Sequence, residues 1–94
     1  MDVIKSFKNK ALALLWNTGK SAKIDVKMRN RILRLLDRLN IAAKPEDMNL
    51  PGFDYHSLKG FDPRRYTVHV NGPWCITFEF EDDGALRVDF EQYH

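Results

Sequence analysis

The fold is decided by residues 66–90, YTVHVNGPWCITFEFEDDGALRVDF, in which apolar and polar residues alternate along three short runs. Such alternation is typical of strands that turn one face to a core and the other to solvent. Two turn sequences separate the runs, Asn-Gly at 71–72 and Asp-Asp-Gly at 82–84, and both favour tight hairpins. This stretch therefore predicts an antiparallel meander of three strands.

The alternation also assigns the side chains of these strands to two unlike faces. One face is apolar and includes Trp74, whose parity with Ile76 and Phe78 favours the core over stacking on a base. The opposite face is predicted to be open and polar: Thr67, His69, Cys75, Thr77, Glu79, Arg87 and Asp89. A weaker strand is expected over 55–59, and residues 3–7 can add a short strand near the N-terminus.

Two helices are expected before the sheet. The first covers residues 11–16, with Ser6 as its N-cap and Gly19 near its end. The second spans roughly residues 26–40 and is capped by Asp25. Apolar residues recur at helical spacing along this second segment and should form its buried face: Met28, Ile32, Leu35, Leu36 and Leu39.

The chain is expected to be one α+β domain over residues 1–94, with the two N-terminal helices packed on one face of the antiparallel sheet. At 94 residues, of which 44% are apolar, it can form a modest core but is short for a large cofactor-binding enzyme. Its one Cys excludes an internal disulfide and suits a reducing compartment. We expect a cytoplasmic protein without a membrane partner, because no apolar run approaches ~20 residues and the N-terminus lacks a signal-peptide pattern.

The net charge of +2 conceals two unlike halves. Residues 1–50 hold 11 Lys and Arg against 5 Asp and Glu, a net of +6, whereas residues 51–94 hold 4 against 8, a net of −4. The basic residues within 27–38 are most simply the solvated face of a helix. They also suit attraction to RNA phosphates, which require positive charge but no particular spacing. The small total charge therefore does not exclude an RNA partner.

Two groups of side chains can carry acid–base chemistry. His56 and Lys59 lie near the weaker strand, and Tyr93 and His94 continue directly from the last strand. An imidazole titrates near neutral pH and a lysine adds a fixed positive charge, so together they suit RNA cleavage through attack of a 2′-OH on the adjacent phosphate. The ordinary alternatives are a solvated His and Lys and a frayed chain end.

The His and Cys residues form no recognisable metal motif. They stand at positions 56, 69, 75 and 94, without the CxxC, HxH or HExxH spacing that places ligands together. Cys75 also lacks a nucleophile motif, and a small residue on a strand is its simplest explanation. Because no glycine-rich phosphate or dinucleotide loop is present either, we expect neither a metal nor a cofactor.

Four parts of the chain together resemble one family. They are IKSF at 4–7, LPG at 50–52 with HSLKG at 56–60, VNGPWCITF at 70–78 and EQYH at 91–94. They resemble the HigB toxins, a branch of the RelE/ParE superfamily of bacterial toxin–antitoxin systems, and the order and spacing of the motifs from residue 56 onward are the specific part of this resemblance. The resemblance implies a RelE-like microbial ribonuclease fold, with helices on one side of a curved antiparallel sheet. It also implies an endonuclease that cuts mRNA on the ribosome without a metal and so inhibits translation.

The resemblance further implies roles for individual residues and partners. His56 and Lys59 match active-site positions of the family, and Tyr93 and His94 match its terminal pair. Either histidine would donate or accept the proton, Lys59 would stabilise phosphate charge, and Tyr93 would orient or stack on the RNA. The implied partners are a cognate helix-turn-helix antitoxin (HigA-like), the ribosome with its mRNA, and operator DNA only through the toxin–antitoxin complex.

Two positions depart from the pattern of the family. Many members carry an Arg, thought to hold the scissile phosphate, where this chain has Cys75, and Gln92 stands where members often have Asp. Glutamine keeps a hydrogen bond but cannot act as a base at neutral pH. We expect Arg87, Arg64 or Arg65 to replace the missing cation and to bind RNA.

Cys75 keeps a second interpretation open, a non-catalytic or weakly active module of the same fold that binds RNA or the antitoxin. A gyrase poison, from the ParE side of the superfamily, is disfavoured. Such toxins need no ribonuclease centre of the kind that His56, Lys59, Tyr93 and His94 indicate.

Overall fold

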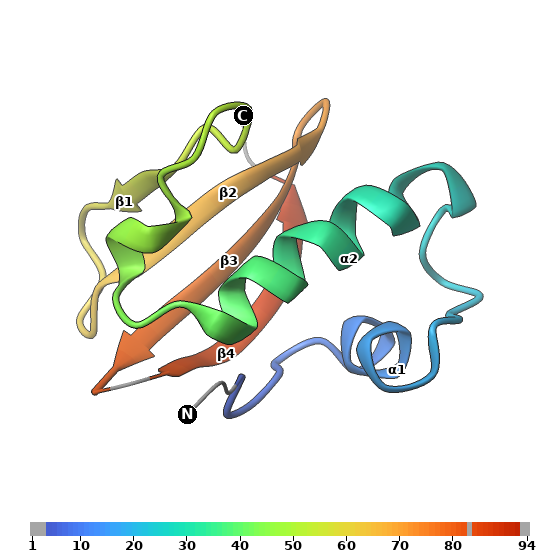
Figure 1. The fold of residues 1–94 in the computed structure, drawn as a ribbon, viewed down its shortest axis with the longest axis horizontal. Coiled ribbons are helices and arrows are strands. Elements are labelled where there is room, and N and C mark those ends of the chain that lie inside the picture. Colours follow the sequence, from blue (N-terminus) through green and yellow to red (C-terminus); the bar gives the residue numbers. More distant parts are fainter. Residues whose placement is uncertain (1–3, 83, 93–94) are drawn as a thin grey trace.

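Two helices precede four antiparallel strands in the computed structural model, which describes residues 4–82 and 84–92. The elements are α1 (Lys10–Thr18), α2 (Val26–Ile41), the 3₁₀ helix η1 (Pro45–Met48), β1 (His56–Leu58), β2 (Arg65–Asn71), β3 (Trp74–Glu81) and β4 (Gly84–Gln92). The strands form one sheet in the order β1-β2-β3-β4, and each pairs antiparallel with its neighbour. Figure 1 shows α2 lying across one face of this sheet. The predicted α+β meander is therefore confirmed.

Capping residues set the bounds of both helices. The side chain of Asn9 accepts a hydrogen bond from the Leu12 N–H at 3.0 Å, so α1 begins one residue after Asn9. Gly19 ends α1 with a φ of 80°, a conformation that glycine adopts without steric penalty. Asp25 caps α2 as predicted, by accepting from the Lys27 N–H at 2.9 Å.

The predicted role of Ser6 as a helix cap is wrong. Residues 4–8 run beside β4, and two isolated parallel bridges join them to it, in place of the full strand expected near the N-terminus. The Ser6 hydroxyl accepts a hydrogen bond from the Arg87 N–H of β4 at 2.8 Å. Because this segment is committed to the edge of the sheet, α1 begins only beyond it.

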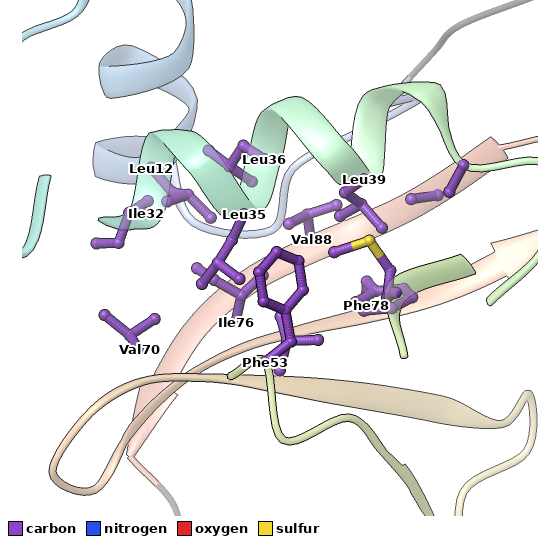
Figure 2. Packing of buried hydrophobic residues seen from close by; sticks show 14 of the residues in the cluster. Leu12, Ile32, Leu35, Leu36, Leu39, Phe53, Val70, Ile76, Phe78 and Val88 are labelled. Atoms are coloured by element: carbon purple, nitrogen blue, oxygen red, sulfur yellow. The ribbon is translucent and has the colours of Figure 1, made fainter. Parts of the chain in front are cut away.

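The core lies between α2 and the apolar face of the sheet. Four residues of α2 are completely buried, as their spacing predicts: Ile32, Leu35, Leu36 and Leu39. Figure 2 shows Leu35, Ile76 and Phe53 gathered in this layer. Trp74 packs against the core and stacks on Phe90 with ring centroids 4.6 Å apart, which confirms its predicted place. Each large buried side chain contributes ~1.5–3 kcal/mol, so this layer holds the helices on the sheet.

The opposite face of the sheet is less open than the alternation predicts. Thr67, Thr77 and Glu79 were expected to face solvent, yet none is more than 7% exposed. Arg65 lies among them, and its guanidinium donates at 2.9 Å to both the Glu79 carboxylate and the Thr77 hydroxyl. A charge can be buried where it meets an opposite charge and further hydrogen bonds. The prediction of a uniformly solvated polar face is therefore wrong for these residues.

A bulge in β4 changes the position of Arg87. Thr77 pairs with Asp89 and Glu79 pairs with Leu86, so β4 takes three steps where β3 takes two. Arg87 lies within the bulge at a φ of 51°, in the left-handed region. The assignment of faces by parity assumes an unbroken period of two, which the bulge interrupts. Parity therefore does not place Arg87, although its side chain is exposed.

Candidate active site

A hollow of about 490 Å³ opens on the polar face of the sheet, across β1, β2 and the start of β3. It is lined by Asp54, His56, Leu58, Thr67, His69, Gly72 and Cys75. Ligand sites of ~300–1,000 Å³ are typical for small molecules, so the volume suits part of a nucleotide chain. The hollow gathers the histidines of the described residues with the cysteine, and it is the candidate active site.

His56 stands at the first position of β1 and pairs with Thr67 of β2. Its Nε2 is 3.0 Å from Oδ1 of Asp54, and the two side chains are 62% and 68% exposed. A carboxylate only accepts hydrogen bonds, so Nε2 carries a proton and Nδ1 is the acceptor of the neutral ring. An exposed pair of this kind contributes at most ~1 kcal/mol to stability. Its effect is to orient the imidazole.

The loop over residues 52–55, which precedes β1, is fastened to both β2 and α2. The carbonyl of Phe53 accepts from the His69 N–H at 2.8 Å, and the Phe53 ring is buried in the core. Arg31 of α2 lies over this ring, with its guanidinium carbon 5.7 Å from the centroid. The same guanidinium donates to the carbonyls of Gly52 and, at 2.9 Å, His69. The helical layer thus positions the loop of the candidate site.

An aromatic stack supports the same loop. Tyr55 stacks on Tyr66 with centroids 6.0 Å apart, and Tyr66 stacks in turn on Phe78 of the core. Burial, followed by the nearby Glu46 carboxylate, raises the pKa of Tyr55 to about 12. The phenol is therefore neutral at physiological pH, and it packs the loop against the sheet.

His69 is set opposite Cys75 by the hairpin between β2 and β3. Its Nε2 is 3.0 Å from the carbonyl oxygen of Gly72, which only accepts, so this ring also keeps a proton on Nε2. The alternation predicts the face of His69 but assigns it no part in the site. The sequence signal that points to it is the Asn-Gly turn at 71–72, because a hairpin there brings the end of β2 against the start of β3. The irregular pairing between His69 and Asn71 then sets position 69 opposite position 75.

Of the predicted cations near β1, two are exposed to solvent and one is buried in the sheet. Lys59 follows β1 and Arg64 precedes β2, and both are exposed, each one residue beyond the paired Leu58 and Arg65. Arg65 itself is 7% exposed, and its guanidinium is held by Glu79 and its neighbours. The structure therefore brings Lys59 and Arg64 to the same end of the β1–β2 pair and commits Arg65 to the interior of the sheet.

The predicted residues on β4 lie apart from one another. β4 sets Glu91 opposite Cys75, four residues beyond Arg87, which corresponds to roughly 13 Å along a strand. Arg87 therefore does not lie beside Cys75. Gln92 is exposed at the end of β4, where it pairs with Trp74.

The predicted terminal pair, Tyr93 and His94, lies outside the described residues. Within residues 4–82 and 84–92, no three side chains of His, Cys, Asp or Glu are gathered in a way that could hold a metal ion. In the same part of the chain, no helix is both long and apolar enough to cross a bilayer. The hollow offers two imidazoles and a threonine hydroxyl, which are groups suited to proton transfer and to binding anions.

Comparison with known proteins places the chain in a family. The family model described as RelE-like toxin of type II toxin-antitoxin system HigB matches residues 5–94. The chain belongs to this HigB-like toxin family. It is 32% identical over 92 residues to the Endoribonuclease HigB of Proteus vulgaris, in an alignment that covers 98% of this chain and 100% of that protein. The family that the sequence motifs resemble is confirmed, and the polar hollow is therefore part of a HigB-like toxin.

Proposed function

We propose that this HigB-like toxin is an endoribonuclease that cuts mRNA on the ribosome and thereby inhibits translation. The observation that carries the proposal is the contact between His56 and Asp54 in the hollow, which fixes the proton on one nitrogen of an exposed imidazole. The Proteus vulgaris relative, which is named an endoribonuclease, supports the same activity.

The proposed reaction is a transphosphorylation that needs no metal. A base removes the proton of a ribose 2′-OH, the 2′ oxygen bonds to the adjacent phosphorus, and the bond from phosphorus to the 5′ oxygen breaks. An acid then protonates the leaving 5′ oxygen, which gives a 2′,3′-cyclic phosphate and a 5′-OH. We assign the two proton transfers to His56 and His94. Lys59 stabilises the charge on the phosphate and Tyr93 orients the RNA.

The proposed RNA contacts come from exposed groups around the hollow and on β4. Arg64 and Arg87 are exposed cations, and Gln92 is an exposed hydrogen-bonding group. Arg65 has an indirect part in this proposal: its guanidinium is already bound to Glu79, so it holds β2 and β3 in position and does not itself contact RNA. Exposed basic residues of α2 add long-range attraction to ribosomal RNA: Lys27, Arg34 and Arg38.

We further propose that residues 1–94 act as one toxin domain in the cytoplasm, without a cofactor, and are neutralised by a cognate helix-turn-helix antitoxin of the HigA type. The type II toxin–antitoxin system in the family description supports an antitoxin partner. In this proposal operator DNA is bound only through the toxin–antitoxin complex.

A second candidate function is a non-catalytic or weakly active module that binds RNA or the antitoxin. It is favoured by Cys75, which places a thiol in the hollow where a cation was expected. The distance of Arg87 from this position along β4 favours it as well.

Mapping of mRNA 5′ ends on ribosomes after induced expression distinguishes the two functions. The wild-type chain is expected to produce new 5′ ends, and Lys59→Ala and a deletion of His94 to remove them. Lys20→Ala is the matched control, because it removes an exposed lysine that follows α1, remote in the chain from β1 and β2. Growth arrest without new 5′ ends would exclude the nuclease and favour the binding module. Cuts that persist in both variants would retain the function and exclude the assigned site.

A further inference from the structure

The hydroxyl of Thr67 is the one buried side-chain group without a hydrogen-bond partner among the described residues. Thr67 is 7% exposed, and it lies in the middle of β2 with its side chain among the lining of the hollow. A buried hydroxyl without a partner lowers the stability of the native state, and such groups are rare in folded proteins. A molecule that enters the hollow with a hydrogen-bond acceptor would satisfy this hydroxyl once the side chains that cover its oxygen move aside.

His69 lies beside this hydroxyl in a position that complements His56. His56 pairs with Thr67, and His69 is two residues further along β2, so the two histidines are diagonal neighbours about 7–8 Å apart. Each ring has its Nε2 held by an acceptor of the protein, Asp54 for one and Gly72 for the other. Each ring therefore has its Nδ1 available to a bound molecule.

We propose that His69 and the Thr67 hydroxyl form a phosphate-binding subsite of the hollow, which holds the RNA phosphodiester against His56. The Thr67 O–H donates to a phosphate oxygen, and the His69 ring donates through Nδ1 when it is protonated. Cys75, which pairs with His69, is not a cation, so His69 is the member of that pair that can carry positive charge. This inference rests on the proposed ribonuclease function and adds two substrate-contacting residues to it.

Binding of a short 2′-O-methyl oligoribonucleotide to the full-length chain tests the subsite, because this probe lacks the attacking 2′-OH and remains intact. The oligonucleotide is titrated into the protein while the NMR signals of the His56 and His69 rings are recorded. Binding is expected to shift the His69 signals together with those of His56. Thr67→Val is expected to weaken binding about 5-fold and His69→Gln about 10-fold or more. Thr67→Ser, which keeps the hydroxyl, and Ser57→Ala, which removes an exposed hydroxyl of β1 outside the hollow, should bind nearly as the wild type does.

Thermal unfolding separates this role from a purely structural one. Thr67→Val replaces a hydroxyl that lacks a partner with a methyl group of similar shape, so its Tm should rise by about 4–8 °C while its affinity falls. A Tm and an affinity that fall together would indicate damage to the fold and overturn the proposal. Wild-type affinity in both Thr67→Val and His69→Gln, an equal loss in Ser57→Ala, or no binding by the wild-type chain would overturn it too.

The ribosome assay keeps this inference distinct from the proposed function. If the wild-type chain cuts mRNA and both variants cut it equally well, the nuclease is retained and the subsite is excluded. If the wild-type chain binds the oligonucleotide through Thr67 and His69 but cuts no mRNA, the subsite is retained and the nuclease is excluded.

Discussion

Arg31 of α2 donates a hydrogen bond to the backbone carbonyl of His69 at 2.9 Å, so a helix of the basic half holds a strand of the candidate site directly. The same guanidinium reaches the carbonyl of Gly52 and covers the ring of Phe53. One side chain therefore joins α2, the loop before β1 and β2. The basic helix is not only a solvated surface, since this arginine positions the hollow.

Arg31→Ala is expected to destabilise the chain by about 2 kcal/mol, because two backbone carbonyls lose a charged donor. Urea unfolding followed by circular dichroism measures this difference. Arg34→Ala is the matched control on α2, since Arg34 is exposed and its loss should change stability by no more than ~0.5 kcal/mol. Equal effects of the two substitutions would contradict the positioning role of Arg31.

Arg65→Ala is expected to destabilise the chain by about 3–5 kcal/mol, because it leaves the Glu79 carboxylate buried without its partner. The double variant Arg65→Met with Glu79→Leu should recover most of this loss, since it removes both charges and keeps the volume filled. Denaturant unfolding of the single and double variants forms the test. A double variant no more stable than Arg65→Ala would show that the loss does not come from an unpaired charge.

Alkaline titration is expected to show a late ionisation of Tyr55, because burial raises the pKa of this phenol from 10.0 to about 12. Between these values the native chain keeps a proton that the unfolded chain releases. The stability that this phenol contributes is therefore complete below pH 10 and is lost as the pH rises toward 12. Ultraviolet difference absorbance detects the ionisation, and Tyr55→Phe should remove both the late step and this part of the alkaline destabilisation. A late step that persists in Tyr55→Phe would assign it to another tyrosine.

Asp54→Asn is expected to lower kcat for mRNA cleavage about 10-fold with little change in KM, because the carboxylate orients His56 and touches no substrate in the proposed reaction. His56→Gln should lower kcat further, by roughly 10²-fold or more, because it removes the proton-transfer group itself. Asparagine tolerates the φ of 49° at position 54, so the loop is expected to keep its conformation. Single-turnover cleavage on programmed ribosomes measures both effects, and a larger loss in Asp54→Asn than in His56→Gln would reverse the assigned roles.

The helices and strands were predictable because their signals are local. Period-two alternation and two hairpin turns predict β2, β3 and β4, and the spacing of Ile32, Leu35 and Leu39 predicts the buried face of α2. These patterns depend only on residues within one or two turns of each other. The motif around His56 was also visible in the sequence, since its residues are contiguous.

Local patterns failed where distant residues meet. The position of Ser6 in the sequence is that of a helix cap. Its hydroxyl instead accepts a hydrogen bond from the Arg87 N–H of β4, more than 80 residues along the chain. One bulge in β4 breaks the period of two on which the predicted face of Arg87 depended. Arg65 resembles a solvent-exposed arginine, but Glu79 and Thr77 on the neighbouring strand make its burial favourable.

The sequence by itself determined the α+β class, the order of the strands and the helix faces, and it supplied the candidate residues for acid–base chemistry. Only the tertiary structure decided which of these residues share the hollow, because pairing across strands sets His56 beside Thr67 and His69 beside Cys75. The physical reason is that sequence periodicity and contacts between strands act over different separations along the chain. Hydrophobic periodicity acts along the chain, whereas hydrogen bonds and charge pairs depend on distances across strands that no linear pattern contains.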